Sequence, residues 1–473
     1  MTTTIAAPAA PAAPATEAAA LDPRTRALLF APIVPLLLKL AWPNVVVMLA
    51  QAATGLIETF WVSRLGTDAL AGMALVFPGV MLMQMISAGS LGGGISSAIA
   101  RALGARKTED ADALVVHALV INVVLGLVMS ALALAFGPDL YRALGGRGGS
   151  LAAALTYSNV VFTGNVLLWV MNGLASCVRG TGNMLVPALT IVVGTAVLIP
   201  LSPLLIFGIG PFPALGIAGG GVAMVLTFAG GAAFLTWYVL SGRSVVRIRR
   251  APLRRRFFGA ILGVGAVAVI SSLQTNVTIG CATAIVATVT GPAGIAGYGT
   301  GARLEYLLIP LVFGLGAPLV ALVGTNIGAG QRSRALRIAF VGGLLAFAMT
   351  ELIGGAAALW PVAWLGLFGH DPGMLATGSA YLRAVGPFYG FFGLGLAVYF
   401  ASQGAGKLGW PLLAGFLRMI IGIGGGWLVL RATGSLFGLF IALGLGMLTY
   451  GLMTTAAVAL GSWFQRSAPA AAT

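Results

Sequence analysis

Long apolar segments separated by short loops dominate this chain and limit what it can fold into. Twelve segments of about twenty residues or more lie between clusters of Gly, Pro and charged residues, and an α-helix of that length crosses a bilayer. Only 8% of the 473 residues are charged, whereas a soluble domain carries about 25%. The pattern predicts an all-α integral membrane protein with twelve transmembrane helices.

Lys and Arg residues gather in alternate loops between these segments. With an inside N-terminus, the outside loops hold only Arg64, Arg142, Arg147 and Arg431 of the 26 basic residues. The positive-inside rule then places both termini in the cytoplasm. We expect a multi-pass, monomeric protein of the bacterial inner (plasma) membrane, surrounded by lipids. Because this bias explains the net charge of +15, we expect no nucleic-acid partner.

Two similar halves follow one another in the chain. Residues 103–107 (LGARK) recur as 327–331 (IGAGQ), and Gly180-Thr181-Gly182 recurs as Gly404-Ala405-Gly406, both at an offset of 224. Six spans per half give parallel repeats, an arrangement common in transporters. We therefore expect a disordered Ala/Pro-rich cytoplasmic tail, an N-terminal lobe, a basic connector, a C-terminal lobe and a second tail, at residues 1–32, 33–242, 243–256, 257–462 and 463–473.

The first apolar segment carries an acid. Asn44, Gln51 and Glu58 recur every seven residues and so share one face of a helix, with Thr54 one turn before the acid. An ionisable group within a membrane helix is costly and usually faces protein or a wet cavity. The alternative is a Glu hydrogen-bonded into the bundle to fix its packing.

Two further acids, Glu305 and Glu351, fall within apolar segments. Glu58 and Glu305 should both lie in the outer half of the membrane, one per lobe, and face a common cavity. Such acids could take a proton from outside and release it inside. As alternatives, a guanidinium from a neighbour could neutralise Glu305, and Glu351 could accept a packing hydrogen bond.

Polar, aromatic and flexible apolar side chains near these acids are candidates for lining a substrate cavity. Met side chains adapt to varied ligands, although a plain lipid-facing or core position is the favoured explanation for each such residue. The candidate substrate-binding residues are Asn44, Phe77, Met81, Gln274, Asn276, Tyr298 and Glu351.

Motifs of enzymes and cofactor sites are not found. His117 and His370 are far apart in the sequence, and Cys177 and Cys281 lie in apolar segments. The glycines at 92–94 lack the Lys-Ser/Thr of a phosphate-binding loop. We expect neither enzymatic activity nor a cofactor or metal, so that transport would either draw on an ion gradient or only equilibrate the substrate.

Five stretches in order along the chain carry a resemblance to a known family. They are residues 56–66 (LIETFWVSRLG), 96–104 (SSAIARALG), 179–183 (RGTGN), 302–306 (ARLEY) and 323–330 (VGTNIGAG). Together they resemble the multidrug and toxic compound extrusion (MATE) family over roughly residues 35–460.

The resemblance implies two pseudo-symmetric six-helix lobes that alternate between inward-open and outward-open states. Members export amphipathic, often cationic, organic compounds in exchange for protons or sodium ions. The first-helix acid belongs to the coupling site in many members, so Glu58 is the expected coupling residue, together with Gln51, Thr54 and Glu305. Glu58 stands where Asp is commoner, and Ser202 stands where some members carry a second acid.

Two other functions stay open at this stage. One is a lipid-linked precursor flippase of the same broad superfamily, which would prefer additional helices and a basic central cavity. The other is a non-transporting membrane receptor or scaffold, which a large soluble domain would favour.

Overall fold

The computed structural model describes residues 21–464, and every regular element within that range is a helix. Eleven helices are long and apolar enough to cross a membrane, or twelve when the bent pair Gly148–Thr163 and Asn165–Gly180 counts as one span. The expected all-α membrane fold is therefore confirmed.

Among the described residues, the helices of the first half surround two large apolar cores and two small ones. A π-helical turn, η1, joins α4 to α5 without a loop. The elements are α2 (Pro23–Phe30), α3 (Ile33–Ser63), α4 (Thr67–Gln84), η1 (Met85–Leu91), α5 (Gly92–Gly104), α6 (Thr108–Ala143), α7 (Gly148–Thr163), α8 (Asn165–Gly180), α9 (Leu185–Phe207) and α10 (Ile217–Leu240).

The second half repeats this plan, with short 3-10 and π-helical turns inside two of its spans. Its elements are α11 (Arg255–Val289), α12 (Pro292–Gly328), α13 (Arg332–Leu359), α14 (Pro361–Leu365), α15 (Pro372–Val385), η2 (Gly386–Phe388), α16 (Tyr389–Ala405), α17 (Gly409–Met419), η3 (Ile420–Gly425), α18 (Gly426–Thr433) and α19 (Leu436–Ala459).

The expectation of a disordered tail over residues 1–32 is wrong for its last part, where α2 forms. The Asp22 side chain caps this helix by accepting hydrogen bonds from the backbone N–H groups of Arg24 and Thr25, at 2.9 and 3.4 Å. Pro23 occupies the first helical position, where its missing N–H is not needed. Leu28 is buried against the second lobe. Residues 1–20 and 465–473 lie outside the described residues.

The apolar segment over residues 151–177 does not form one straight helix, because the chain bends by 46° between α7 and α8. Gly164 lies at the bend, and a Cβ atom there would collide with the side chain of Val225 on α10. The missing side chain thus lets the broken helix approach its neighbour closely.

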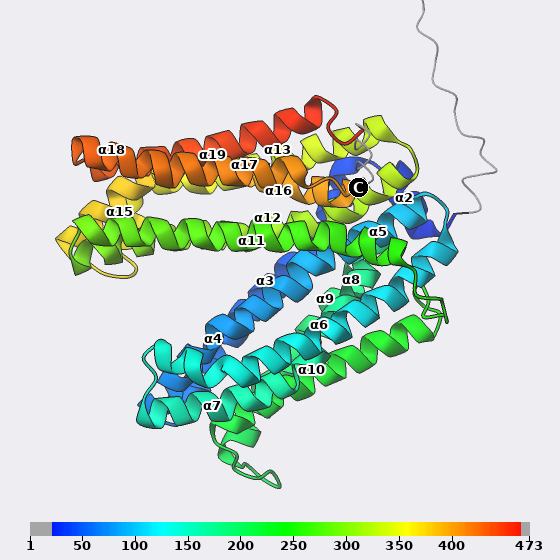
Figure 1. Cartoon of the computed structure of the whole chain (residues 1–473), viewed down its shortest axis with the longest axis horizontal. Coiled ribbons are helices and arrows are strands. Elements are labelled where there is room, and N and C mark those ends of the chain that lie inside the picture. Colours follow the sequence, from blue (N-terminus) through cyan, green and yellow to red (C-terminus); the bar gives the residue numbers. More distant parts are fainter. Residues whose placement is uncertain (1–20, 465–473) are drawn as a thin grey trace, which may run out of the picture.

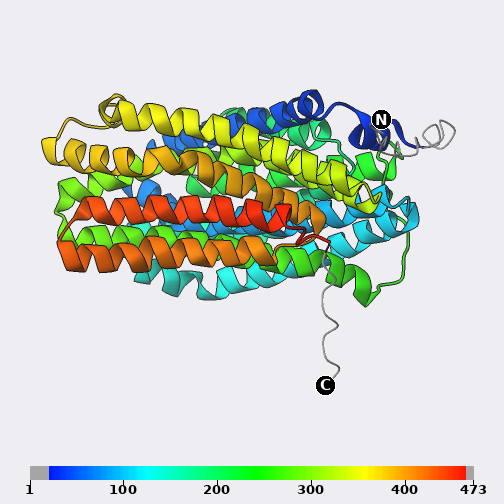
Figure 2. The same ribbon diagram turned by 90° about the horizontal axis from the view of Figure 1, so that it is seen from above.

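The helices form two bundles that lie close together at one end and separate toward the other (Figure 1). Helix α2, the connector between α10 and α11 and the end of α19 lie at the closed end, while α7, α15 and α18 reach the open end. A view turned by 90° shows the helices running along the long axis of the molecule (Figure 2). We call the contact of η1 and α5 with α11, α12 and α16 the seam.

The first helix of each half packs on both lobes. In α3, Leu37 and Ala41 belong to the core of the second lobe, whereas the later part of the helix contacts α9 and α10 of the first. In α11, Phe257 and Ile261 belong to a core of the first lobe. These two helices therefore link the bundles mechanically.

Glycines at equivalent positions of the repeat allow the two backbones to touch at the seam. A Cβ atom on Gly104 would collide with the carbonyl of Thr325, and one on Gly328 would collide with the carbonyl of Arg101. Both the glycines and the carbonyl residues are 224 positions apart, so the contact is reciprocal about a pseudo-two-fold axis. Hydrogen bonds from Ser97 Oγ and Arg101 Nη1 to the Gly404 carbonyl, each 3.0 Å, add to it.

We predict that Gly328→Leu prevents full closure of the seam, because overpacking a tight contact costs about 1–3 kcal/mol. Spin labels at Glu109 and Ser333, which are exposed and equivalent in the repeat, should report a longer and broader distance between the lobes. Native Cys177 and Cys281 would be replaced before labelling.

Gly263→Leu is the matched control, since nothing lies within 4 Å of a Cβ atom at that position of α11. It should leave the distance unchanged. A Gly328→Leu distribution that superimposes on that of the parent would contradict the role given to the glycine pair.

Candidate functional site

Glu58 lies near the end of α3 and is 2% exposed. A Cβ atom on Gly220 of α10 would lie 3.5 Å from its Oε2 and 3.9 Å from the Oγ of Ser202 on α9, so the carboxyl and hydroxyl groups are neighbours. Among the described residues, none forms an ion pair with Glu58, and its oxygens lack a hydrogen bond of good geometry. The site is thus a buried carboxyl group without a counter-ion.

The same face of α3 is fixed against α9 one turn earlier. The Thr54 hydroxyl donates to the Ala50 carbonyl at 2.8 Å and lies 3.2 Å from Thr195 Oγ1. Gln51 is half-buried, and Asn44 is buried but donates to the Leu40 carbonyl of its own helix at 3.2 Å. The heptad face therefore points into the first lobe around Thr54 and Glu58.

Among the described residues, Glu58 and Glu305 lie in different surroundings and do not line one common pocket as expected. Glu58 is enclosed by helices of the first lobe, and Glu305 lines a pocket whose residues all belong to the second. The reason is that α3 divides its packing: its first part lies against the second lobe, and its acid-bearing part lies against α9 and α10.

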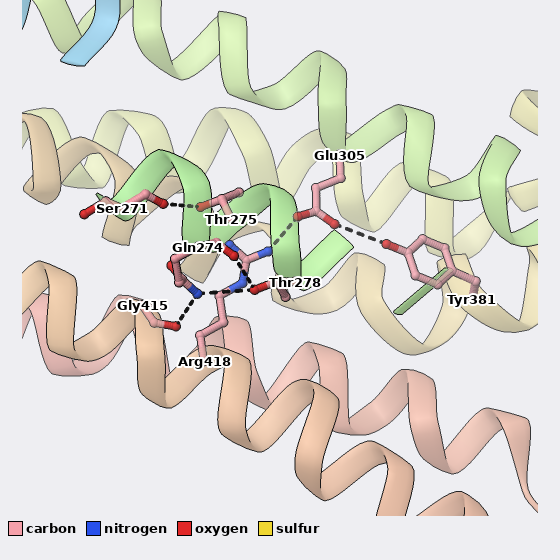
Figure 3. A network of polar contacts seen from close by, with 8 residues as sticks. All are labelled: Ser271, Gln274, Thr275, Thr278, Glu305, Tyr381, Gly415 and Arg418. Carbon is pink, nitrogen blue, oxygen red and sulfur yellow. Dashed lines mark hydrogen bonds and ion pairs between the residues drawn. The ribbon is translucent and has the colours of Figure 1, made fainter. Parts of the chain in front are cut away.

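Glu305 is neutralised within the second lobe (Figure 3). Arg418 on α17 donates from Nη2 to its Oε1 at 2.7 Å, and both side chains are only 9% exposed. The Tyr381 hydroxyl on α15 donates to Oε2 at 3.2 Å. This confirms the alternative in which a neighbouring guanidinium balances the acid, with Arg418 as that neighbour.

Arg418 and Tyr381 were missed from the sequence, although one signal was available. An Arg inside an apolar span needs a counter-ion, and Glu305 is one of few acids in such spans. Beside the pair, Gln274 Nε2 donates to the Gly415 carbonyl at 2.7 Å and to Thr278 Oγ1 at 3.2 Å, joining α11 to α17 (Figure 3).

Of the candidate cavity residues, Tyr298 lies in the pocket with Glu305 and stacks on Phe440, with centroids 6.0 Å apart. Asn276 is exposed and donates to the Ser272 carbonyl at 2.9 Å. Glu351 is half-buried and accepts a 2.7 Å hydrogen bond from Gly390 N, the contact expected of a packing role.

The remaining candidates, Phe77 and Met81 on α4, are 47% and 44% exposed and do not line the pocket that holds Glu305. The structure therefore brings Tyr298 and Glu305 together, with Gln274 beside their pocket. The other candidate substrate residues do not join them.

A family model named MatE matches the chain twice, at residues 43–204 and 268–428. The second match begins at residue 268, one residue from the position that lies 224 residues after the start of the first match. A relative from Shewanella oneidensis described as a FAD transporter is 29% identical over 384 residues, which is 79% of this chain and 82% of the relative. The probable multidrug resistance protein NorM of Thermotoga maritima is 24% identical over 387 residues, 81% of this chain and 82% of its own.

Solved structures share the fold. A MATE crystal structure in the bent conformation covers 94% of this chain and 98% of its own, with a TM-score of 0.86 and 24% identity. The outward-facing conformation of a multidrug resistance MATE transporter covers 94% and 99%, with a TM-score of 0.83 and 23% identity. At these identities the likeness concerns the fold alone.

We predict that Arg418→Met destabilises the protein by about 3–5 kcal/mol, because it leaves Glu305 as an unpaired buried charge. Adding Glu305→Gln should recover most of this loss, since the amide is uncharged and still accepts from Tyr381. The measurement is the free energy of unfolding in mixed detergent micelles.

Tyr381→Phe serves as the reference, because it removes one neutral donor and should cost only about 1 kcal/mol. If the double variant lost as much stability as the single variants Arg418→Met and Glu305→Gln added together, Glu305 and Arg418 would not stabilise each other.

Proposed function

Because this chain belongs to the MatE family of membrane transporters, we propose that it is a secondary active exporter that exchanges amphipathic or cationic organic compounds for protons or sodium ions. Members of this family are transporters rather than enzymes and work without a cofactor. The substrate class and the coupling ion are the parts that we propose.

The architecture supports alternating access. Two bundles meet at a seam made of close glycine contacts, while α3 and α11 each pack on both lobes. We assign the closed end to the cytoplasm because the basic connector between α10 and α11 lies there (Figure 1). In this orientation the bundles separate toward the outside of the cell.

The observation that carries the proposal is the buried carboxyl group of Glu58 without a counter-ion. A charge placed there is costly unless a proton, a cation or water reaches it. Glu58 lies on the helix that links the lobes, so binding or loss of an ion at this residue changes the packing of α3. Glu305 is the weaker coupling candidate, since Arg418 already balances its charge.

Export of a flavin nucleotide is a second candidate function. The Shewanella oneidensis relative described as a FAD transporter matches over most of both chains and supports this substrate class. The two candidates share the exchange mechanism and differ in the charge of the transported compound.

We predict that purified protein in proteoliposomes moves the cationic dye rhodamine 123 when a proton or a sodium gradient is imposed. Each gradient is applied alone, with a matched potassium diffusion potential, so that the coupling ion is identified. Movement that depends on neither gradient would contradict the antiporter assignment.

We further predict that Glu58→Gln reduces gradient-driven dye movement to the level of empty liposomes, because the amide cannot gain or lose a proton or bind a cation by charge. Glu351→Gln is the matched control, since its amide oxygen can still accept from Gly390 N. Full exchange in Glu58→Gln would remove that residue from the mechanism.

A further inference from the structure

A pocket lies within the seam, on the pseudo-two-fold axis that relates the lobes. Its lining comes from η1, α5 and α8 of the first lobe and from α12 and α16 of the second. Three pairs of residues at equivalent positions of the repeat line it: Gly93 and Ala317, Ser96 and Val320, Arg179 and Gln403. We call this the axis pocket.

Arg179 brings an uncompensated positive charge to the axis pocket. Its side chain is 9% exposed, and it forms no hydrogen bond or ion pair with the residues that the structure describes. No Asp or Glu lines the pocket. Arg101 at the same seam differs, because its guanidinium donates to Ser97 and to the Gly404 carbonyl. A buried guanidinium without such partners is costly, so a partner that arrives as a ligand would relieve that cost.

Gln403, at the position of the repeat equivalent to Arg179, supplies a second donor to the pocket. Its side chain is 1% exposed, and its Nε2 has no acceptor among the described residues. The amide lies directly against Gly93, where a Cβ atom would collide with it. Two groups that can only donate hydrogen bonds, Arg179 and the Gln403 NH2, therefore line one small cavity.

Aromatic side chains complete the second-lobe wall of the pocket. Phe313 and Phe400 both line it, with ring centroids 5.4 Å apart in an edge-to-face contact. The pocket thus combines a fixed positive charge and an amide donor with apolar ring surface. Carboxylates and phosphates are the groups that a guanidinium binds best, and aromatic rings favour flat apolar ligands.

We propose that the axis pocket recognises the anionic group, a phosphate or a carboxylate, of an aromatic substrate, with Arg179 as the charged donor. The proposal rests on the exporter function above and names a substrate class for it. As the lobes part at the seam, the donors become accessible from the cytoplasmic side; closure buries them again. Arg179 repels a cationic group at this site, so the cationic part of an amphipathic substrate would lie outside the axis pocket.

The test is equilibrium binding to the purified full-length protein, without any gradient, using two pairs of fluorescent compounds. Riboflavin 5′-phosphate against riboflavin isolates the phosphate, and rhodamine 110 against its methyl ester, rhodamine 123, isolates the carboxylate. The wild type should bind the anionic member of at least one pair about ten-fold more tightly, as expected for a charge-assisted hydrogen bond.

Arg179→Gln places glutamine at both equivalent positions of the pocket and should abolish this preference. Arg179→Lys keeps the positive charge and should keep most of the preference. Because the two compounds of a pair are compared on the same variant, a general loss of folded protein does not change the ratio of their affinities. Glu58→Gln should retain the preference even where exchange fails, so that the two proposals can fail separately. An equal preference in Arg179→Gln and the wild type, or none in the wild type for either pair, would overturn the assignment.

Discussion

Burying an ionisable group away from water costs free energy, and this cost explains how the buried charged side chains of this structure are arranged. Glu305 and Arg418 meet that cost by pairing with each other, and Arg101 meets it through hydrogen bonds across the seam. Among the described residues, the buried Glu58 carboxyl group lacks a hydrogen-bond partner, and Arg179, 9% exposed at the axis pocket, pairs with no acid. In a transporter, these two are the groups whose charge a mobile ion or substrate can balance, and that is why we assign coupling to one and recognition to the other.

The two repeated halves form the two-lobe framework, and the charged residues proposed to carry function lie at positions that differ between the halves. The glycine contacts of Gly104 and Gly328 are reciprocal and hold the lobes at one end. The charged residues break the symmetry: the position equivalent to Glu58 is Ala282, and the position equivalent to Arg179 is Gln403. A symmetric seam allows two bundles to rock about a shared axis, while asymmetric charges let the two lobes perform different tasks.

Much of the fold could be predicted because its signals are local. Hydropathy marks the spans, and repeated glycine motifs mark the duplication. Helix α2 was missed because its Asp22-Pro23 cap was overlooked within a low-complexity tail. The surroundings of Glu58 and the partner of Glu305 depend on how distant helices pack, and no local pattern encodes that. Ser202 was noted as a departure from the family pattern, and only the structure places it beside Glu58.

The central claim is that Glu58 holds an ion that the substrate displaces. By linkage, substrate binding to purified protein must then release that ion even without a membrane. Proton release into a weakly buffered solution, or release of radioactive sodium from preloaded protein, measures this directly. The account predicts that substrate releases one of these ions from the wild type and neither from Glu58→Gln. Equal release from both proteins, or none from the wild type, would contradict it.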